Sequence, residues 1–371
     1  MADFKGIVQQ LLSQAGIEIN GTATWDIQVN NPDFYKRAIK HGTLGLGESY
    51  MDGWWDCEAV DQLFDKMLRA DLHEKVRITL LHKALILMGR LSNMQTLLRS
   101  KRVVDIHYDS GSDIILSFLD PYKQYSCGYF KGTTDLGIAQ EQKLDLICKK
   151  LMLSGKDRVL DIGCGYGGFA RFAAERYGCE VIGISPSKEQ IKFANEFCKN
   201  LPVQFVQSDY RNFSGSFTKV VSVGMIEHVG YKNYRALMEM VARCLADNGL
   251  FLLQTIGGNT STVTGDPWLM RYIFQNSMLP SARQITQAAE GFFVLEDLHN
   301  FGEYYDLTLM AWNKNFVENW PRFEPLYPEK VFRMWDYYLC HFAGTFRARM
   351  NQLWQFVFSK KGIPGGYPSI R

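Results

Sequence analysis

The chain has 371 residues, of which 46% are hydrophobic, and its 41 Lys and Arg against 39 Asp and Glu give a formal net charge of +2. This length and apolar content predict a large core and two domains, and the balanced charge excludes the long-range positive field typical of nucleic-acid-binding proteins. The N-terminus lacks a basic start followed by an apolar run, so we expect a cytoplasmic protein. The most apolar stretch, 78–91, contains His82 and Lys83 and is too short to cross a bilayer, so any membrane contact is expected to be peripheral.

The cysteines predict neither a disulfide framework nor a metal centre. The sequence has eight of them, widely spaced, with no CxxC pair and no Cys/His ligand cluster. Thiols with this distribution in a cytoplasmic protein stay reduced, and a structural zinc site is not expected.

The first residues, 1–75, are expected to form a small α-rich domain. Amphipathic helical patterns there flank a glycine-rich turn region that contains Trp54 and Trp55. A basic, weakly patterned stretch ends at residue 105 and indicates a helical connector, which we place at 76–105. The remaining residues, 106–371, are expected to form one catalytic domain with an insertion and with helices at the C-terminus.

From about residue 140, short apolar runs alternate with helical patterns of about a dozen residues. This alternation predicts βαβ units and a largely parallel, doubly wound α/β sheet of the Rossmann type. The expected strands lie at 157–165, 179–185, 203–210, 219–230, 250–258 and at the start of 292–312, and the expected helices lie at 139–153, 167–178, 187–200, 234–249 and in the rest of 292–312.

Two ionisable residues, Glu227 and His228, follow the apolar run of the fourth predicted strand. In a parallel sheet, ligands bind beyond the carboxyl ends of the strands, near the switch in strand order. We therefore predict that Glu227 faces a ligand-binding crevice.

The sequence VLDIGCGYGG at 159–168 places Asp161, Gly163, Gly165 and Gly167 between a strand and a helix. Glycines allow a tight turn and let backbone amides approach a ligand, and the helix N-terminus favours negative groups. A glycine turn alone is equally consistent with plain loop geometry. Its spacing, DxGxGxG, resembles that of class I S-adenosylmethionine-dependent methyltransferases more than that of nicotinamide enzymes.

The ends of the second and third strands supply further candidate cofactor residues. An acidic residue usually ends the second strand and holds the ribose, but here the position is Ser185, which together with Gln190 offers neutral hydrogen bonds. Asp209 and Tyr210, at the end of the third strand, are placed to meet the edge and the face of the adenine. The alternative for this pair is an ordinary Asp turn beside a packed Tyr.

Seven stretches together resemble the bacterial cyclopropane-fatty-acyl-phospholipid synthases, and the first 75 residues fit the small N-terminal domain of that family. The resemblance implies a class I methyltransferase fold and S-adenosylmethionine as cofactor, with Tyr125 and Ser126 among its binding residues. The stretches are IHYDSGSDIILSFLD (106–120), QYSCGYF (124–130), VLDIGCGYGG (159–168), VSVGMIEHVGYKNY (221–234), DPWLMRYIFQNSMLPS (266–281), HNFGEYYDLTLMAW (299–312) and FRARMNQLWQFVFS (346–359).

The resemblance also implies a chemistry: transfer of a methyl group to the cis double bond of an acyl chain in a membrane phospholipid. Attack by an alkene leaves a positive charge on carbon, so the site must exclude water and line the cation with aromatic faces or negative charge. A base must then take a proton from the transferred methyl so that the ring closes. In this family the base is thought to be a bound bicarbonate.

By resemblance, Glu227 is one of the groups that hold bicarbonate. Two adjacent anions repel unless a proton lies between them or donors surround them. The donors implied are the Cys127 thiol, the Tyr305 hydroxyl and the Ile256 backbone amide. Two alternatives remain for Cys127: a covalent nucleophile, for which no activating His or Asn signature is present, and an inert buried thiol.

The fifth strand departs from the family pattern, which has LLHTIG where this chain has LLQTIG with Gln254. A Gln amide donates and accepts hydrogen bonds but carries no proton away near neutral pH. If the family His only positions bicarbonate, Gln254 can replace it, and we prefer this interpretation to an impaired enzyme. His228 is either a compensating acid or base or a residue that packs at a helix start.

The lipid substrate is expected to contact two aromatic segments. Trp268, Tyr272 and Phe274, in an insertion after the fifth strand, are candidate lining residues of an acyl tunnel, or else ordinary core. Residues 331–361 read as one amphipathic helix, whose aromatic rings and cations suit an anionic bilayer at the inner face of the cytoplasmic membrane; a core stripe is the alternative. The family suggests a homodimer.

Two other function classes stay open. One is a methyltransferase that adds a methyl group to a lipid or a small amine without closing a ring. The other is a non-catalytic lipid-binding or scaffold protein that has lost its cofactor, an idea that rests on Gln254 alone.

Overall fold

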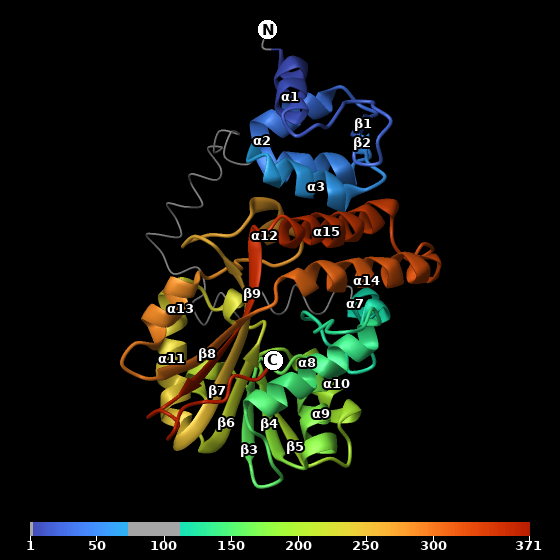
Figure 1. Ribbon diagram of the computed structural model, residues 1–371. Coiled ribbons are helices and arrows are strands. Elements are labelled where there is room, and N and C mark those ends of the chain that lie inside the picture. Colours follow the sequence, from blue (N-terminus) through green and yellow to red (C-terminus); the bar gives the residue numbers. More distant parts are fainter. Residues whose placement is uncertain (1–2, 73–111) are drawn as a thin grey trace. The chain divides into compact units, whose positions relative to one another are not determined.

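The computed structural model describes residues 3–72 and 112–371, which form two compact units (Figure 1). The helical unit contains 3–72, 263–275 and 305–351 of the described residues, and the sheet unit contains 112–262, 276–304 and 352–371. The sequence predicted 106–371 as one domain, whereas two of its segments fold with the N-terminal residues. The predicted connector at 76–105 lies outside the described residues.

The sheet unit is built on seven described strands in the order β5-β4-β3-β6-β7-β9-β8. The five strands from β5 to β7 pair in parallel, and β8 and β9 pair antiparallel, which confirms the predicted α/β sheet. The strands are β3 (Arg158–Ile162), β4 (Glu180–Ser185), β5 (Val203–Gln207), β6 (Phe217–Val223), β7 (Leu245–Gly258), β8 (Val294–Asn300) and β9 (Asn351–Ser359).

Helices cover both faces of this sheet. Alternate residues of β3 point to opposite faces, so Val159 and Leu160 pack in two different hydrophobic cores, one on each face of the sheet. Side-chain caps begin several of these helices: Asp135 accepts from the Ile138 amide, and Ser281 forms a capping box with Gln284. The helices are α7 (Ser112–Phe118), α8 (Leu136–Lys150), α9 (Gly168–Tyr177), α10 (Lys188–Phe197), α11 (Tyr234–Cys244) and α13 (Ala282–Ala289), with short turns η1 (Tyr210–Asn212), η2 (Ile226–His228) and η3 (Tyr231–Asn233).

The C-terminal segment corrects one prediction. We expected 331–361 to be a single helix, but α15 (Glu329–Arg347) ends at Arg347, Arg349 has φ 62°, and β9 follows as a strand. Nearly every side chain of β9 is buried, including Phe356 and Val357, because the strand lies inside the sheet. Tertiary strand pairing therefore overrides the helical spacing of the aromatic residues. A smaller correction is that the helix expected to reach residue 249 ends at Cys244, where β7 begins.

The helical unit is α-rich, as predicted for its N-terminal part. Trp55 is fully buried in its core, and α15 packs on α2 and α3. Arg347 near the end of α15 forms ion pairs with Asp61 (2.6 Å) and Asp306 (2.8 Å). The elements are α1 (Phe4–Ser13), β1 (Gln28–Val29), α2 (Asp33–Met51), β2 (Trp55–Asp56), α3 (Val60–Arg69), α12 (Pro267–Tyr272), α14 (Glu303–Asn319), η4 (Trp320–Arg322) and α15 (Glu329–Arg347). The first two residues of α14 belong to the sheet unit.

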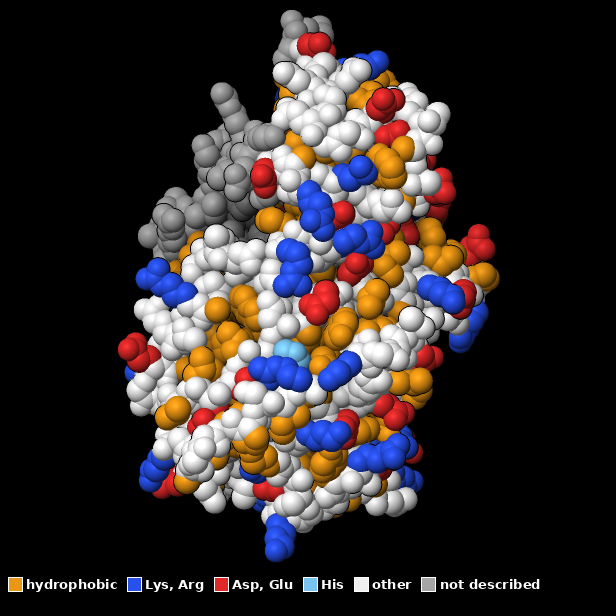
Figure 2. Space-filling model, viewed as in Figure 1, with side chains coloured by type: hydrophobic (Ala, Val, Ile, Leu, Met, Phe, Trp, Pro, Cys, Tyr) orange, Lys and Arg blue, Asp and Glu red, His pale blue; other side chains and the backbone are white. Residues whose placement is uncertain are grey.

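Charges of both signs are interspersed on the face shown in Figure 2, in keeping with the small net charge. Within the described ranges, none of the helices combines the length and the apolar character needed to span a membrane.

Candidate active site

The glycine turn joins β3 to α9 and needs glycine for its conformation. Gly163, Gly165 and Gly167 have φ values of 81°, 52° and 85°, in the left-handed region that other residues rarely adopt. The amides of Gly163 and Cys164 both donate to the Ile184 carbonyl, at 2.9 Å and 3.1 Å, and so fix the turn to β4. A side chain at Gly163 would also meet Met225, 2.7 Å away. The turn is therefore the tight glycine turn that the sequence predicted.

Asp161 precedes this turn and is almost fully buried. Its Oδ2 has no hydrogen-bond partner in the described part of the chain. Burial raises the pKa of Asp161 to about 7, although the positive charge of Lys143 opposes the rise. Asp161 thus offers an open acceptor beside the glycine turn.

Ser185 and Gln190, which we predicted to bind the ribose, hydrogen-bond to each other, and the ribose contact stays a prediction. The Ser185 hydroxyl lies at the end of β4 and donates to Gln190 Oε1 at 2.9 Å. Ser187, between them, caps α10 by accepting from the Gln190 amide at 3.3 Å. Both partners of the pair are buried.

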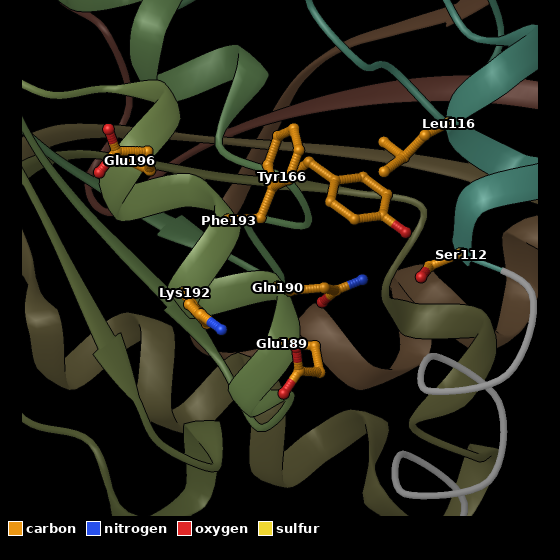
Figure 3. Close-up of a pocket in the computed structure, with 8 residues that line it drawn as sticks. All are labelled: Ser112, Leu116, Tyr166, Glu189, Gln190, Lys192, Phe193 and Glu196. Carbon is orange, nitrogen blue, oxygen red and sulfur yellow. The ribbon is translucent and has the colours of Figure 1, made fainter.

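A pocket of about 260 Å³ opens along α10 beside the glycine turn (Figure 3). The Gln190 amide and the Tyr166 hydroxyl point toward Ser112 of α7 in this view. The pocket is smaller than most small-molecule sites, so it can take part of a ligand of nucleotide size. It is lined by Ser112, Leu116, Tyr166, Glu189, Gln190, Lys192, Phe193 and Glu196.

Asp209 and Tyr210 lie after β5, and Asp209 is already engaged. Arg211 binds both carboxylate oxygens of Asp209, at 2.8 Å and 2.7 Å, and Asp209 caps η1. Burial raises the pKa of Tyr210 to about 12, and its hydroxyl has no hydrogen-bond partner among the described residues. The Asp turn that we gave as the alternative is therefore present, and the adenine contact stays a prediction.

Glu227 lies where the sequence placed it, just after β6. Its Oε1 accepts a hydrogen bond from the Ile256 amide at 2.7 Å, and its backbone carbonyl accepts from the Met278 amide at 2.9 Å. Its Oε2 is buried, and none of the described residues hydrogen-bonds to it. Burial raises the pKa of Glu227 to about 7. The carboxyl group can therefore hold a proton near neutral pH.

Gln254 lies on β7 beside Val223 of β6, with 1% of its surface exposed. Its Oε1 accepts a hydrogen bond from Gln355 Nε2 at 2.8 Å. In the part of the chain that the structure describes, Gln254 Nε2 and Gln355 Oε1 have no partner. Sequence reasoning missed Gln355, because it interpreted the residues of β9 as helical.

Cys127 is fully buried in the sheet unit, and its thiol donates to the Gly128 carbonyl at 3.2 Å. Tyr125 packs its ring near Phe118, with the centroids 6.1 Å apart. Cys127, Glu227, Gln254 and Ile256 thus belong to one unit, and the bicarbonate roles we gave them stay predictions.

The other predicted site residues belong to the helical unit. Tyr305 packs on Phe346, with ring centroids 4.5 Å apart. Trp268 is fully buried against Tyr337, and the Tyr272 hydroxyl donates to Glu48 at 2.9 Å. Phe274 also contacts an aromatic ring of α15, that of Tyr338, at 5.9 Å. These contacts fit the core alternative, and the acyl-lining role stays a prediction.

Two further polar residues, Gln140 and Lys143, were missed by sequence reasoning. Both are fully buried on α8, and both hydrogen-bond to Ser126, which we predicted to bind the cofactor. The sequence pattern that could have predicted their role is two polar residues, three positions apart, on the apolar face of a helix.

No cluster of His, Cys, Asp and Glu within 3–72 and 112–371 has the makings of a metal site. The strand order, the glycine turn and the neighbouring strand ends instead define a class I S-adenosylmethionine-dependent methyltransferase.

Comparison of the amino-acid sequence identifies the family within this class. Residues 95–356 match the family model described as mycolic acid cyclopropane synthetase, and the chain belongs to this family. It is 49% identical to the cyclopropane-fatty-acyl-phospholipid synthase of Escherichia coli strain K12, over 97% of this chain and 94% of that protein. It is also 34% identical to a probable fatty acid methyltransferase of Pseudomonas putida, over 71% of this chain and 70% of that protein.

Solved structures give the same assignment. The cyclopropane synthase MmaA2 from Mycobacterium tuberculosis matches 72% of this chain and 100% of its own, with a TM-score of 0.66 and 26% identity. The mycolic acid cyclopropane synthase CmaA1, complexed with SAH and CTAB, matches 70% of this chain and 98% of its own, with a TM-score of 0.65 and 28% identity.

Proposed function

We propose that this protein transfers the methyl carbon of S-adenosylmethionine to the cis double bond of an unsaturated phospholipid acyl chain and forms a cyclopropane ring. Family membership and 49% identity to a cyclopropane-fatty-acyl-phospholipid synthase support the reaction class. The observation that carries the proposal is that two buried polar atoms have no partner among the described residues: Glu227 Oε2, just after β6, and Gln254 Nε2, on β7.

These two atoms fit a small oxyanion such as bicarbonate. A buried donor or acceptor without a hydrogen bond costs about 1–3 kcal/mol of stability. The presence of two such atoms therefore favours a bound ligand that forms hydrogen bonds with both. Because burial raises the pKa of Glu227 to about 7, its carboxyl group can keep its proton and donate a hydrogen bond to the oxyanion rather than repel it. Gln254 Nε2 would donate a second hydrogen bond, and the Cys127 thiol and the Tyr305 hydroxyl are further proposed donors.

The predicted donation of the Ile256 amide to bicarbonate stays a prediction. In this structure it donates to Glu227 Oε1, so it orients the acid. We propose that it contributes to bicarbonate binding through Glu227.

The chain itself supplies orientation and a dry environment. When bound, S-adenosylmethionine supplies an electrophilic methyl carbon and bicarbonate supplies the base that accepts one of its protons. Cys127, Glu227 and Gln254 are 0%, 5% and 1% exposed, so water that would trap a carbocation is kept from them. Asp161, the glycine turn and the Ser185–Gln190 pair would hold the cofactor.

We further propose that the enzyme acts at a bilayer surface, as a peripheral protein on the inner face of the cytoplasmic membrane, and that it is a homodimer. Exposed apolar side chains of the helical unit support the lipid contact: Leu307 and Val317 of α14 and Leu326 are 46%, 44% and 71% exposed. Two copies would present two such surfaces to one bilayer.

A second candidate is methyl transfer to a lipid without ring closure. In this reaction the carbocation would lose a proton from a neighbouring carbon of the acyl chain, to the bound base, and leave a methyl-branched alkene. Gln254, which departs from the family pattern LLHTIG beside that base, and a relative that is a probable fatty acid methyltransferase favour this candidate. The two reactions give lipids that proton NMR separates, since cyclopropane methylene protons resonate apart from those of a methyl branch.

The test uses the whole protein with vesicles of unsaturated phospholipid and S-adenosylmethionine labelled in its methyl group. We expect the label in a ring methylene of the acyl chain. A labelled methyl branch would establish the second candidate, and an unlabelled lipid, with bicarbonate present, would refute both.

A further inference from the structure

One turn of α8 holds the segment that carries Tyr125, Ser126 and Cys127. Lys143 Nζ donates to Gln124 Oε1 at 2.5 Å and to Ser126 Oγ at 2.9 Å. Gln140, three residues earlier on the same face, donates to the Ser126 carbonyl at 2.7 Å. All of these hydrogen bonds are buried, so water does not compete for them.

Lys143 is an ammonium group in the interior whose two hydrogen-bond acceptors are neutral. Burial lowers the pKa of Lys143 to about 8, and the charges of Asp120 and Asp161 oppose this effect. Asp120 is held in place because its carboxylate accepts the amides of Tyr122 at 2.8 Å and Gln124 at 2.7 Å. The positive charge of Lys143 therefore interacts both with Asp120, at the start of the loop, and with Asp161, which precedes the glycine turn.

We propose that Lys143, supported by Gln140, is a positioning residue for S-adenosylmethionine, because it anchors residues 124–127 through buried hydrogen bonds. This role rests on the proposed function in one respect, that Ser126 and Asp161 belong to the cofactor site. Neither α8 side chain needs to touch the cofactor. Each acts through the residues it holds.

The chain offers a matched control on the same helix. Lys150 lies seven residues after Lys143 and is equally buried, but its Nζ lies 3.0 Å from His299 Nδ1 and 3.8 Å from Asp297 Oδ2. A Met at either position replaces a buried lysine of similar length. Both variants disturb the interior, and only Lys143→Met releases residues 124–127.

The experiment measures the Kd of S-adenosylmethionine by calorimetry, and the thermal midpoint, for the wild type, Lys143→Met, Gln140→Met and Lys150→Met. We expect Lys143→Met to raise Kd by about tenfold or more, which corresponds to losing a charged hydrogen bond at the site. Gln140→Met should raise Kd by a smaller factor, and Lys150→Met should leave it within about twofold at a similar loss of thermal midpoint. Gln140→Met also tests the anchor if Lys143→Met does not fold.

The pH dependence of Kd separates an electrostatic role from a purely structural one. Without Lys143 the pKa of Asp161 rises, so its carboxylate is protonated at higher pH. The other groups acting on Asp161 or Lys143 are Asp120 and the thiols of Cys127, Cys164 and Cys198. Burial raises the pKa of Cys164 and of Cys198, so these thiols stay neutral. The pH below which binding weakens should therefore move upward in Lys143→Met and stay unchanged in Lys150→Met.

Equal Kd values for wild type and Lys143→Met, in an enzyme that still forms the ring, would overturn the positioning role alone. An equal loss of affinity in Lys143→Met and Lys150→Met would also overturn it. Failure of the wild type to bind S-adenosylmethionine would instead overturn the proposed function.

Discussion

Glu227 combines three properties that follow from its place after a buried strand: an oriented Oε1, an open Oε2 and a pKa raised to about 7. The first fixes the carboxyl group, the second leaves room for a ligand atom, and the third allows a proton to lie between two acidic groups. The sequence predicted the position of Glu227, because apolar strands and their ends are visible in the pattern of residues. It did not predict the amide that holds the carboxyl group.

Glu227→Gln should separate activity from stability. A carboxyl group whose folded pKa of about 7 exceeds its ordinary 4.5 contributes stability that is complete below pH 4.5 and is lost as pH rises through 7. The Gln variant lacks this loss. The difference in unfolding free energy, variant minus wild type, should therefore increase by about 3 kcal/mol between pH 4.5 and about pH 8. Urea unfolding at the two pH values measures this change. A difference that does not vary with pH would show that Glu227 titrates normally.

Ring formation by Glu227→Gln should fall by about a hundredfold or more, because the amide cannot share a proton with the oxyanion and so holds the base less well. The vesicle assay measures it. Wild-type rates in a well-folded Gln variant would remove Glu227 from the reaction.

Gln254→His tests whether this position must accept a proton. If Gln254 only orients the oxyanion, His changes the rate of ring formation by less than about threefold, since a ring nitrogen can also donate a hydrogen bond. A gain of about a hundredfold would mean that the wild-type enzyme lacks a general base, and it would contradict our interpretation. Gln254→Leu is the control: it leaves the Gln355 amide unpaired and should cost about 1–3 kcal/mol of stability.

At the scale of elements, the parallel strands and their helices followed from the sequence, and the last strand did not. Residues of β9 are buried on both faces, so they show no alternation of apolar and polar residues, and their aromatic residues continue the spacing of α15. The pairing of Gln355 with Gln254 depends on that strand and was therefore also missed. Side-chain partners such as Arg211 for Asp209 are a matter of tertiary geometry that no local pattern encodes.

Gly257 of β7 lies directly against Trp354 of β9. A Cβ at Gly257 would meet the indole ring of Trp354, a buried residue of β9, whereas a Cβ at Gly258 would have its nearest neighbour 3.6 Å away. Gly257→Ala should cost about 1–3 kcal/mol of unfolding free energy by overpacking, and Gly258→Ala should stay within about 0.5 kcal/mol of the wild type. Urea denaturation of both variants makes the comparison. Similar stabilities for the two would show that the Trp354 ring has room to move.

For the whole molecule, the sequence predicted the α/β class, the cofactor turn and an α-rich N-terminal region, but it divided the chain too simply. Residues 263–275 and 305–351 fold with the N-terminal residues, so Trp268, Tyr272 and Tyr305 belong to a different unit from Glu227. Such interleaving arises from contacts between distant segments, which composition and periodicity do not report.

The dependence of ring formation on bicarbonate tests the central claim most directly. The vesicle assay is run under argon in buffer freed of carbon dioxide, with and without added bicarbonate, for the wild type and for Glu227→Gln. We expect the wild-type rate to fall by about tenfold or more without bicarbonate and to recover when it is added, with no recovery in the variant. A wild-type rate that is the same in both buffers would contradict the account of Glu227 and Gln254 as the holders of a catalytic oxyanion.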